Sequence, residues 1–132
     1  MIGVIESYRD RPWLRVLPNL DHTAYLSLLR RADVLVGNTS SGIIEAPSFH
    51  LPVVNIGERQ EGRERSENVL DVPPRRDEIG RALLRALGDA EFRERVRRCT
   101  NPYGDGRASG RIVEVLRRVR VGPDLLQKQF AD

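Results

Sequence analysis

The residues best suited to chemistry lie in one short segment, residues 37–42, which reads Gly-Asn-Thr-Ser-Ser-Gly. The segment joins the expected end of a buried strand to the expected start of a helix, which is where open parallel sheets bind ligands. Thr39, Ser40 and Ser41 offer hydroxyl groups, and Gly42 lets the backbone approach a ligand closely. Free N–H groups at a helix start favour an anion, so the segment favours a diphosphate. It is neither a Walker loop nor a Gly-x-Gly-x-x-Gly fingerprint.

Two charged residues extend this chemistry. Glu45 follows Ser41 by four residues, so a helix would place its carboxylate one turn from the phosphate position. There it could accept two hydrogen bonds from a ribose diol. Arg59 follows the next expected strand at the same rim, where a guanidinium can bind phosphate through paired hydrogen bonds. The combination indicates a nucleotide ligand.

The same residues also admit structural roles. Ser40 and Ser41 could only cap a helix, which is the commonest task of serine at such a junction. The carboxylate of Glu45 and the guanidinium of Arg59 could be ordinary surface charges. His50 is expected to be a packed or exposed loop residue rather than a catalytic one.

Short apolar runs alternate with amphipathic patterns, which predicts an α/β fold with a Rossmann-like parallel sheet and flanking helices. Strands are expected at residues 14–17, 34–36, 53–56 and 68–72. Helices are expected at residues 23–32, with Asp21 or Thr23 as N-cap, and at residues 41–49, with an end or bend near Pro47. Further helices are expected at residues 77–87, 90–98 and 107–119, and residues 57–67 are expected to form a loop.

The two ends of the chain carry further expectations. The helix at residues 107–119 should turn Ile112, Val113, Leu116 and Val119 inward, and the tail after Pro123 could add a helical turn or two. Tyr103 is expected to anchor its glycine-rich turn. Residues 2–8 suggest a start inside a helix or at an edge strand, with fewer strands than a usual sheet. The chain is therefore predicted to be one domain, residues 1–132, truncated at its N-terminus.

Composition narrows the class of protein. A chain of 132 residues with 39% hydrophobic residues suits a single core. It has no apolar run of about 20 residues and no basic region before an apolar stretch at its start, so a soluble, cytoplasmic protein is expected. Cys99 is the only cysteine, and His22 and His50 are the only histidines. No disulfide, metal or cofactor is therefore predicted.

The net charge of +3 and the sequence pI near 9.6 raise the question of nucleic-acid binding. The arginines are interleaved with acidic residues, for example in residues 61–65 and 91–95. This pattern is typical of a solvated mixed surface. Because no nucleic-acid recognition motif is present, no nucleic-acid partner is predicted.

Several segments together resemble a known family. Residues 32–49 and 52–57, with residues 59–60, 62–63 and 67–69, are similar to the C-terminal domain of UDP-N-acetylglucosamine 2-epimerases. The similarity is closest to the hydrolysing branch, which forms N-acetylmannosamine and UDP for sialic acid synthesis. Residues 101–106 and the helix after them resemble the ending of that family. The resemblance runs from about Val16 to Leu116 and implies the C-terminal half of a GT-B fold.

The resemblance also implies roles for individual residues. UDP, alone or within UDP-N-acetylglucosamine, would be the ligand, with the diphosphate held by Thr39, Ser40 and the adjoining backbone of Ser41 and Gly42. Glu45 matches the acid that binds the ribose, Arg59 matches an arginine of the nucleotide site, and the backbone near Leu20 would meet the uracil ring. Thr39 stands where serine is usual, and His50 stands where glycine is common.

One part of the family's site has no match. Its proton-transferring carboxylates and an active-site histidine come from the N-terminal domain or the hinge region, so no catalytic residue is predicted in this chain. The chain is expected to belong to an enzyme without being catalytic alone, either as a fragment or as a subunit encoded apart from its partner. An N-terminal domain or another copy is the expected partner. The alternatives are a degenerate nucleotide-binding domain that serves protein association, and half of a GT-B glycosyltransferase.

Overall fold

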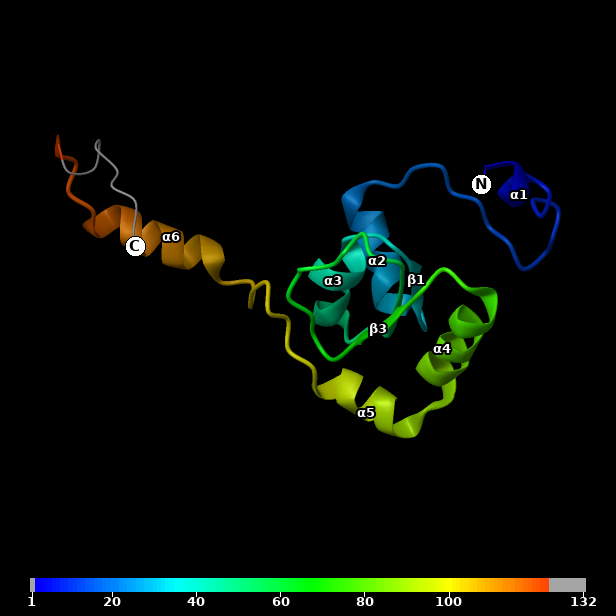
Figure 1. Ribbon diagram of the computed structural model, residues 1–132. Helices are drawn as coiled ribbons and strands as arrows, with labels where there is room; N and C mark the ends of the chain where they lie inside the picture. Colours follow the sequence, from blue (N-terminus) through cyan, green and yellow to red (C-terminus); the bar gives the residue numbers. More distant parts are fainter. Residues whose placement is uncertain (1, 124–132) are drawn as a thin grey trace.

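A computed structural model describes residues 2–123 of the chain. Within this range, a sheet of three parallel strands has the order β1-β2-β3 (Figure 1). The strands are β1 (Leu35–Gly37), β2 (Val53–Ile56) and β3 (Val69–Val72). Val36 pairs with Val54, and Val54 pairs with Leu70, so β2 is the central strand. The parallel sheet with helices beside it confirms the predicted α/β, Rossmann-like class.

One face of the sheet packs against α2 (His22–Arg31), α3 (Ser41–Ile44) and the 3-10 helix η1 (Ala46–Phe49). Asp21 is the N-cap of α2, because its Oδ1 accepts a hydrogen bond from the N–H of Ala24 at 2.9 Å. The core on this face contains Leu29, Ala46, Leu51 and Val53, all of them buried. The predicted bend near Pro47 appears as the division between α3 and η1.

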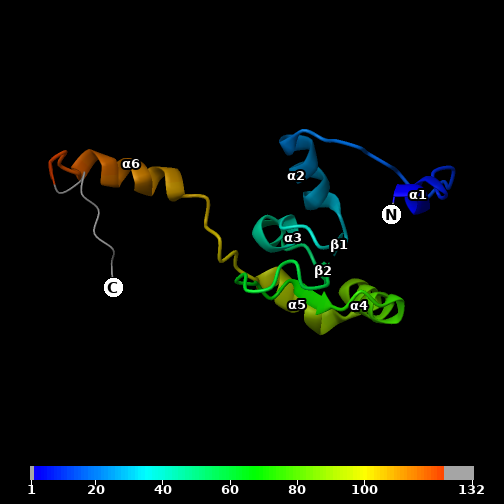
Figure 2. The same ribbon diagram turned by 45° about the horizontal axis from the view of Figure 1, so that its top comes forward.

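The other face packs against α4 (Arg76–Gly88) and α5 (Ala90–Arg98), so the helices lie on opposite sides of the sheet (Figure 2). Neighbouring residues of a strand point to opposite faces. Val54 therefore joins the second core, with Ala82, Ala86, Phe92 and Val96, although Val53 belongs to the first. Asp89 caps α5 by accepting a hydrogen bond from the N–H of Phe92 at 3.0 Å.

The predicted strand at residues 14–17 is wrong. These residues are irregular, and the N–H of Leu14 closes a turn onto the carbonyl of Arg11 at 3.0 Å. A strand exists through its ladder of hydrogen bonds to a neighbour. In the described range β1 pairs only with β2, and no strand is placed on the other side of β1. Before this segment, α1 (Ile2–Glu6) is a helix, one of the two predicted starts.

The last described helix, α6 (Ala108–Arg118), forms where the periodicity predicts it, but its apolar face does not turn inward. Ile112 is 57% exposed and Leu116 is 64% exposed, and Val113 and Val119 are also exposed. Figure 1 shows α6 well apart from the sheet. Periodicity identifies an apolar face but cannot locate the surface that covers it. The helical turn expected after Pro123 falls outside the described residues.

The remaining elements agree with the sequence. Residues 57–67 contain neither helix nor strand, and α5 has the predicted bounds. None of the helices placed by the structure is long and apolar enough to span a bilayer.

Candidate functional site

Gly42 fixes the position of the candidate segment, because it lies at the contact between α3 and the sheet. A Cβ atom at this position would be 2.8 Å from Cγ1 of Val53 and 3.6 Å from Cδ2 of Leu35. Only a glycine lets the start of α3 approach β1 and β2 this closely. Residues 37–42 are therefore held at the carboxyl edge of the sheet, where the sequence placed them.

The hydrogen bonds in this segment show which donors a ligand could use. The N–H of Ser41 donates to Oγ1 of Thr39 at 3.3 Å, and the N–H of Gly42 donates to the carbonyl of Thr39 at 3.3 Å. By contrast, the N–H groups of Thr39 and Ser40 have no protein acceptor in the part of the chain described. The N–H groups without an acceptor therefore precede α3. The N–H groups of Ser41 and Gly42, in the first turn of α3, already donate to Thr39.

Neither Ser40 nor Ser41 caps α3 with its side chain. Ser40 occupies the N-cap position of α3 but makes no capping hydrogen bond with its side chain. Ser41 is the first residue of the helix, and its hydroxyl makes no hydrogen bond to another described residue. The hydroxyl that does bond the local backbone belongs to Thr39. Both serine hydroxyls are therefore available to a ligand.

Glu45 lies at the junction of α3 and η1, with a half-buried side chain. Its Oε2 atom is buried and accepts no hydrogen bond from any residue in the described range. A buried carboxylate oxygen without a donor is unfavourable. A carboxylate can accept two hydrogen bonds from a vicinal diol, which is the chemistry predicted for this residue from the sequence.

Arg59 lies in the loop after β2, and a neighbouring glutamine connects this loop to the candidate segment. Gln60 is 2% exposed, and its Nε2 donates to the carbonyl of Asn38 at 2.7 Å. This bond brings the chain beside Arg59 close to the chain beside Thr39. Arg59 itself is exposed and makes no ion pair or hydrogen bond to the described residues. Gln60 belongs to the segments that resemble the family, but its residue type alone does not reveal this bond.

A second connection that sequence reasoning missed comes from the turn after α5. Asn101 donates from Nδ2 to the carbonyl of Ile44 at 2.8 Å and to Oγ of Ser48 at 2.7 Å. Its Oδ1 accepts from the N–H of Tyr103 at 2.9 Å, and the Tyr103 hydroxyl donates to the carbonyl of Glu64 at 3.1 Å. The anchoring role predicted for Tyr103 is confirmed, and the anchor extends to the loop that carries Arg59.

Two other expected residues have clear places. Leu20 is half-buried just before the N-cap of α2. His50 adopts a left-handed conformation, with φ of 49° and ψ of 39°, which glycine reaches without a steric penalty. Its Nδ1 lies 3.2 Å from the carbonyl oxygen of Val96, so it is the loop residue that was predicted.

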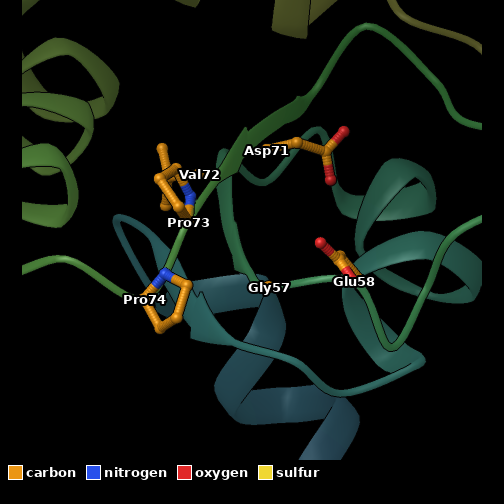
Figure 3. A pocket seen from close by; sticks show the side chains of 6 residues that line it. All are labelled: Gly57, Glu58, Asp71, Val72, Pro73 and Pro74. Atoms are coloured by element: carbon orange, nitrogen blue, oxygen red, sulfur yellow. The ribbon is translucent and has the colours of Figure 1, made fainter.

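A hollow of about 530 Å³ lies beside the candidate segment, where β2 and β3 end. It is lined by Gly57, Glu58, Asp71, Val72, Pro73 and Pro74, with the two acids on one side and the prolines on the other (Figure 3). None of the predicted site residues lines it. Two acidic side chains would repel a diphosphate, so the hollow does not replace the candidate segment as an anion site.

Asp71 in this hollow already has partners. Its Oδ1 accepts a hydrogen bond from Nδ2 of Asn55 at 2.7 Å, and its Oδ2 lies 2.9 Å from Nε of Arg65. Across residues 2–123, no group of three or more His, Cys, Asp or Glu side chains is arranged to hold a metal ion.

Comparison with solved structures identifies the class of fold. The chain matches a crystal structure of a Listeria monocytogenes protein provisionally assigned as a UDP-N-acetylglucosamine 2-epimerase, with a TM-score of 0.73 and 23% identity. The match covers 87% of this chain and 33% of the Listeria chain. The fold is therefore that of one part of a GT-B-type protein, as the sequence predicted.

Sequence comparison identifies the family. The family model described as UDP-N-acetylglucosamine 2-epimerase matches residues 2–117, and the chain belongs to this family. A UDP-N,N'-diacetylbacillosamine 2-epimerase (hydrolyzing) from Legionella pneumophila is 41% identical over 125 residues, which is 95% of this chain and 32% of the relative. Polysialic acid biosynthesis protein P7 of Escherichia coli is 35% identical over 118 residues, which is 89% of this chain and 28% of the relative. The chain spans about a third of the length of these relatives.

Proposed function

We propose that this chain is the domain that binds UDP in a nucleotide-sugar 2-epimerase and that it has no catalytic activity alone. The observation that carries the proposal is the buried Oε2 of Glu45, which has no donor among the described residues. The free N–H groups of Thr39 and Ser40 lie six and five residues before Glu45 in the chain, just ahead of α3. A ligand with a diol and an adjacent diphosphate would donate to the Glu45 carboxylate and accept from the two N–H groups, and the exposed Arg59 adds a cation for the phosphates.

The proposed role in the reaction is electrostatic. In the reaction implied by the family resemblance, a proton leaves C2 of the sugar and UDP departs from C1 to give a glycal-like intermediate. Water or UDP then adds at C1 while a proton returns to the opposite face of C2, which inverts C2. Departure places charge on the diphosphate, and fixed N–H donors and a guanidinium stabilise that charge. We assign no proton-transfer residue to this chain. The acid and the base would come from an N-terminal domain, on the same chain or on a partner, and residues 1–132 would form the nucleotide domain.

The proposal also covers whether UDP is released by hydrolysis and which sugar the enzyme uses. Hydrolysis, with release of free sugar and UDP, is supported by the name of the Legionella relative, which describes a hydrolysing epimerase. The sequence predicts UDP-N-acetylglucosamine as substrate, and the family description supports this choice. The same Legionella name makes a diacetylated sugar the competing substrate. A cytoplasmic location stays a prediction from the sequence.

Isothermal titration with UDP tests the proposal. The wild-type chain should bind UDP, and Glu45→Ala should weaken binding roughly 10- to 100-fold, because hydrogen bonds to a charged group contribute about 1.5–3 kcal/mol. Glu61→Ala is the matched control, since Glu61 is an exposed acid in the loop that carries Arg59, and its loss should leave the affinity unchanged. No heat at millimolar UDP, or equal affinity in Glu45→Ala, would contradict the proposal.

The exposed apolar face of α6 favours a second candidate function, protein association without nucleotide binding. Ile112, Val115 and Leu116 are each more than half exposed, and such faces commonly mark contact sites. Under this alternative, size-exclusion chromatography shows a dimer that ignores UDP, and Leu116→Glu disrupts it. A strict monomer eliminates the alternative.

A further inference from the structure

We propose that Asn101 is a positioning residue that fixes the orientation of Glu45 toward the ribose. The inference rests on the proposed nucleotide site and adds a residue to it. Asn101 lies 57 residues from Ile44 in the chain, yet its Nδ2 donates to the Ile44 carbonyl at 2.8 Å. Ile44 directly precedes Glu45, so this bond holds the peptide group that leads into the carboxylate-bearing residue.

The need for this bond follows from the local sequence. At the junction of α3 and η1, the carbonyl of Ile44 would accept from the N–H of Pro47 or Ser48. Pro47 has no N–H, and the N–H of Ser48 donates to the carbonyl of Glu45 at 3.0 Å. The Ile44 carbonyl is therefore left without a helical donor. The amide of Asn101 takes the place of the N–H that Pro47 lacks.

Asn101 also holds the chain on the far side of Glu45. The same Nδ2 donates to Oγ of Ser48 at 2.7 Å, so the residues at positions 44 and 48 are tied to one side chain. Its Oδ1 is occupied by the N–H of Tyr103 at 2.9 Å, which holds the amide in this orientation. Glu45 stands between the two tied positions with φ of −97° and ψ of −42°. Loss of the amide donor frees this backbone and with it the direction of the carboxylate.

The experiment compares UDP with 2′,3′-dideoxy-UDP by isothermal titration on the whole chain. Wild type should prefer UDP by about tenfold or more, since the dideoxy compound lacks the diol. Asn101→Ala and Asn101→Asp, which both remove the amide donor, should lose most of this preference while dideoxy-UDP binds as before. Tyr103→Phe is the matched control, because it removes only the bond to Glu64, and it should keep the preference.

A second arm restores the missing donor. Pro47→Ala returns an N–H at position 47, so adding it to Asn101→Ala should recover part of the preference for UDP. An unchanged preference in Asn101→Ala, or equal weakening of both nucleotides, overturns the inference and leaves the nucleotide site standing. Absence of UDP binding by the wild type overturns the proposed function itself.

Discussion

Replacing Gly42 with alanine tests the contact that places the candidate segment against the sheet. The added Cβ would lie 2.8 Å from Cγ1 of Val53, with Leu35 Cδ2 at 3.6 Å. Carbon atoms pack best at about 3.5–4.0 Å, so about 0.7 Å of overlap must be relieved. Val53 is 3% exposed and belongs to the central strand β2, and a β-branched side chain has few alternative rotamers. The start of α3 must therefore move away from the sheet.

Overpacking of this kind costs about 1–3 kcal/mol. Against this, alanine gains about 0.5–1 kcal/mol over glycine in a helix, so the net loss expected for Gly42→Ala is about 0–2.5 kcal/mol. Urea unfolding followed by circular dichroism measures it. UDP affinity should also fall, because Ser40 and Ser41 move with the start of α3.

Two variants serve as controls for this prediction. A Cβ at Gly80, within α4, meets nothing within 4 Å, so Gly80→Ala should stabilise the protein by about 0.5–1 kcal/mol. In a Val53→Ala background the clashing methyl group is absent, and Gly42→Ala should then cost nothing. If Gly42→Ala stabilises the protein as Gly80→Ala does, or costs the same in the Val53→Ala background, the reasoning is refuted.

Two further predictions concern the scaffold. Asn68 is fully buried and its Nδ2 donates to the carbonyl of Leu51 at 2.9 Å, so Asn68→Ala should destabilise the fold by about 1–3 kcal/mol in urea unfolding; an unchanged midpoint would contradict this. The hydrogen bond from the Phe92 N–H and the nearby Arg85 lower the pKa of Asp89. The stability that Asp89 contributes is therefore present above its unfolded pKa of about 3.9 and is lost as the pH falls through the lower folded value. The free energy of unfolding should decline less below about pH 4 in Asp89→Asn than in wild type. Identical declines in the two proteins would show that Asp89 does not contribute this stability.

The elements that the sequence predicted well have local causes. Asp21 and Asp89 mark helix starts through their side-chain oxygens, and Pro47 divides residues 41–49 because it lacks an N–H. The central strand β2 places a valine on each face of the sheet and stands between clear turn signals. In these cases, the signal and its effect lie within a few residues of each other.

The predictions that failed, and the residues that were not predicted, depend on contacts with distant parts of the chain. The segment at residues 14–17 has strand-like residues, but pairing requires a neighbour that the described range does not provide. The sequence shows that α6 has an apolar face, but it does not show that this face is exposed. Gln60 and Asn101 act through bonds to positions 22 and 57 residues away, which no local pattern reveals.

The central claim is that the segment around Thr39 and Ser40, with Glu45 and Arg59, holds a nucleoside diphosphate. The most direct test is a titration of the ¹⁵N-labelled chain with UDP, monitored by the backbone amide resonances in NMR spectra. The largest shifts should occur at Thr39, Ser40 and Ser41, with smaller shifts at Glu45 and Arg59. Shifts confined to the hollow around Asp71 and Val72 or to α6, or no shifts at all, would contradict the claim.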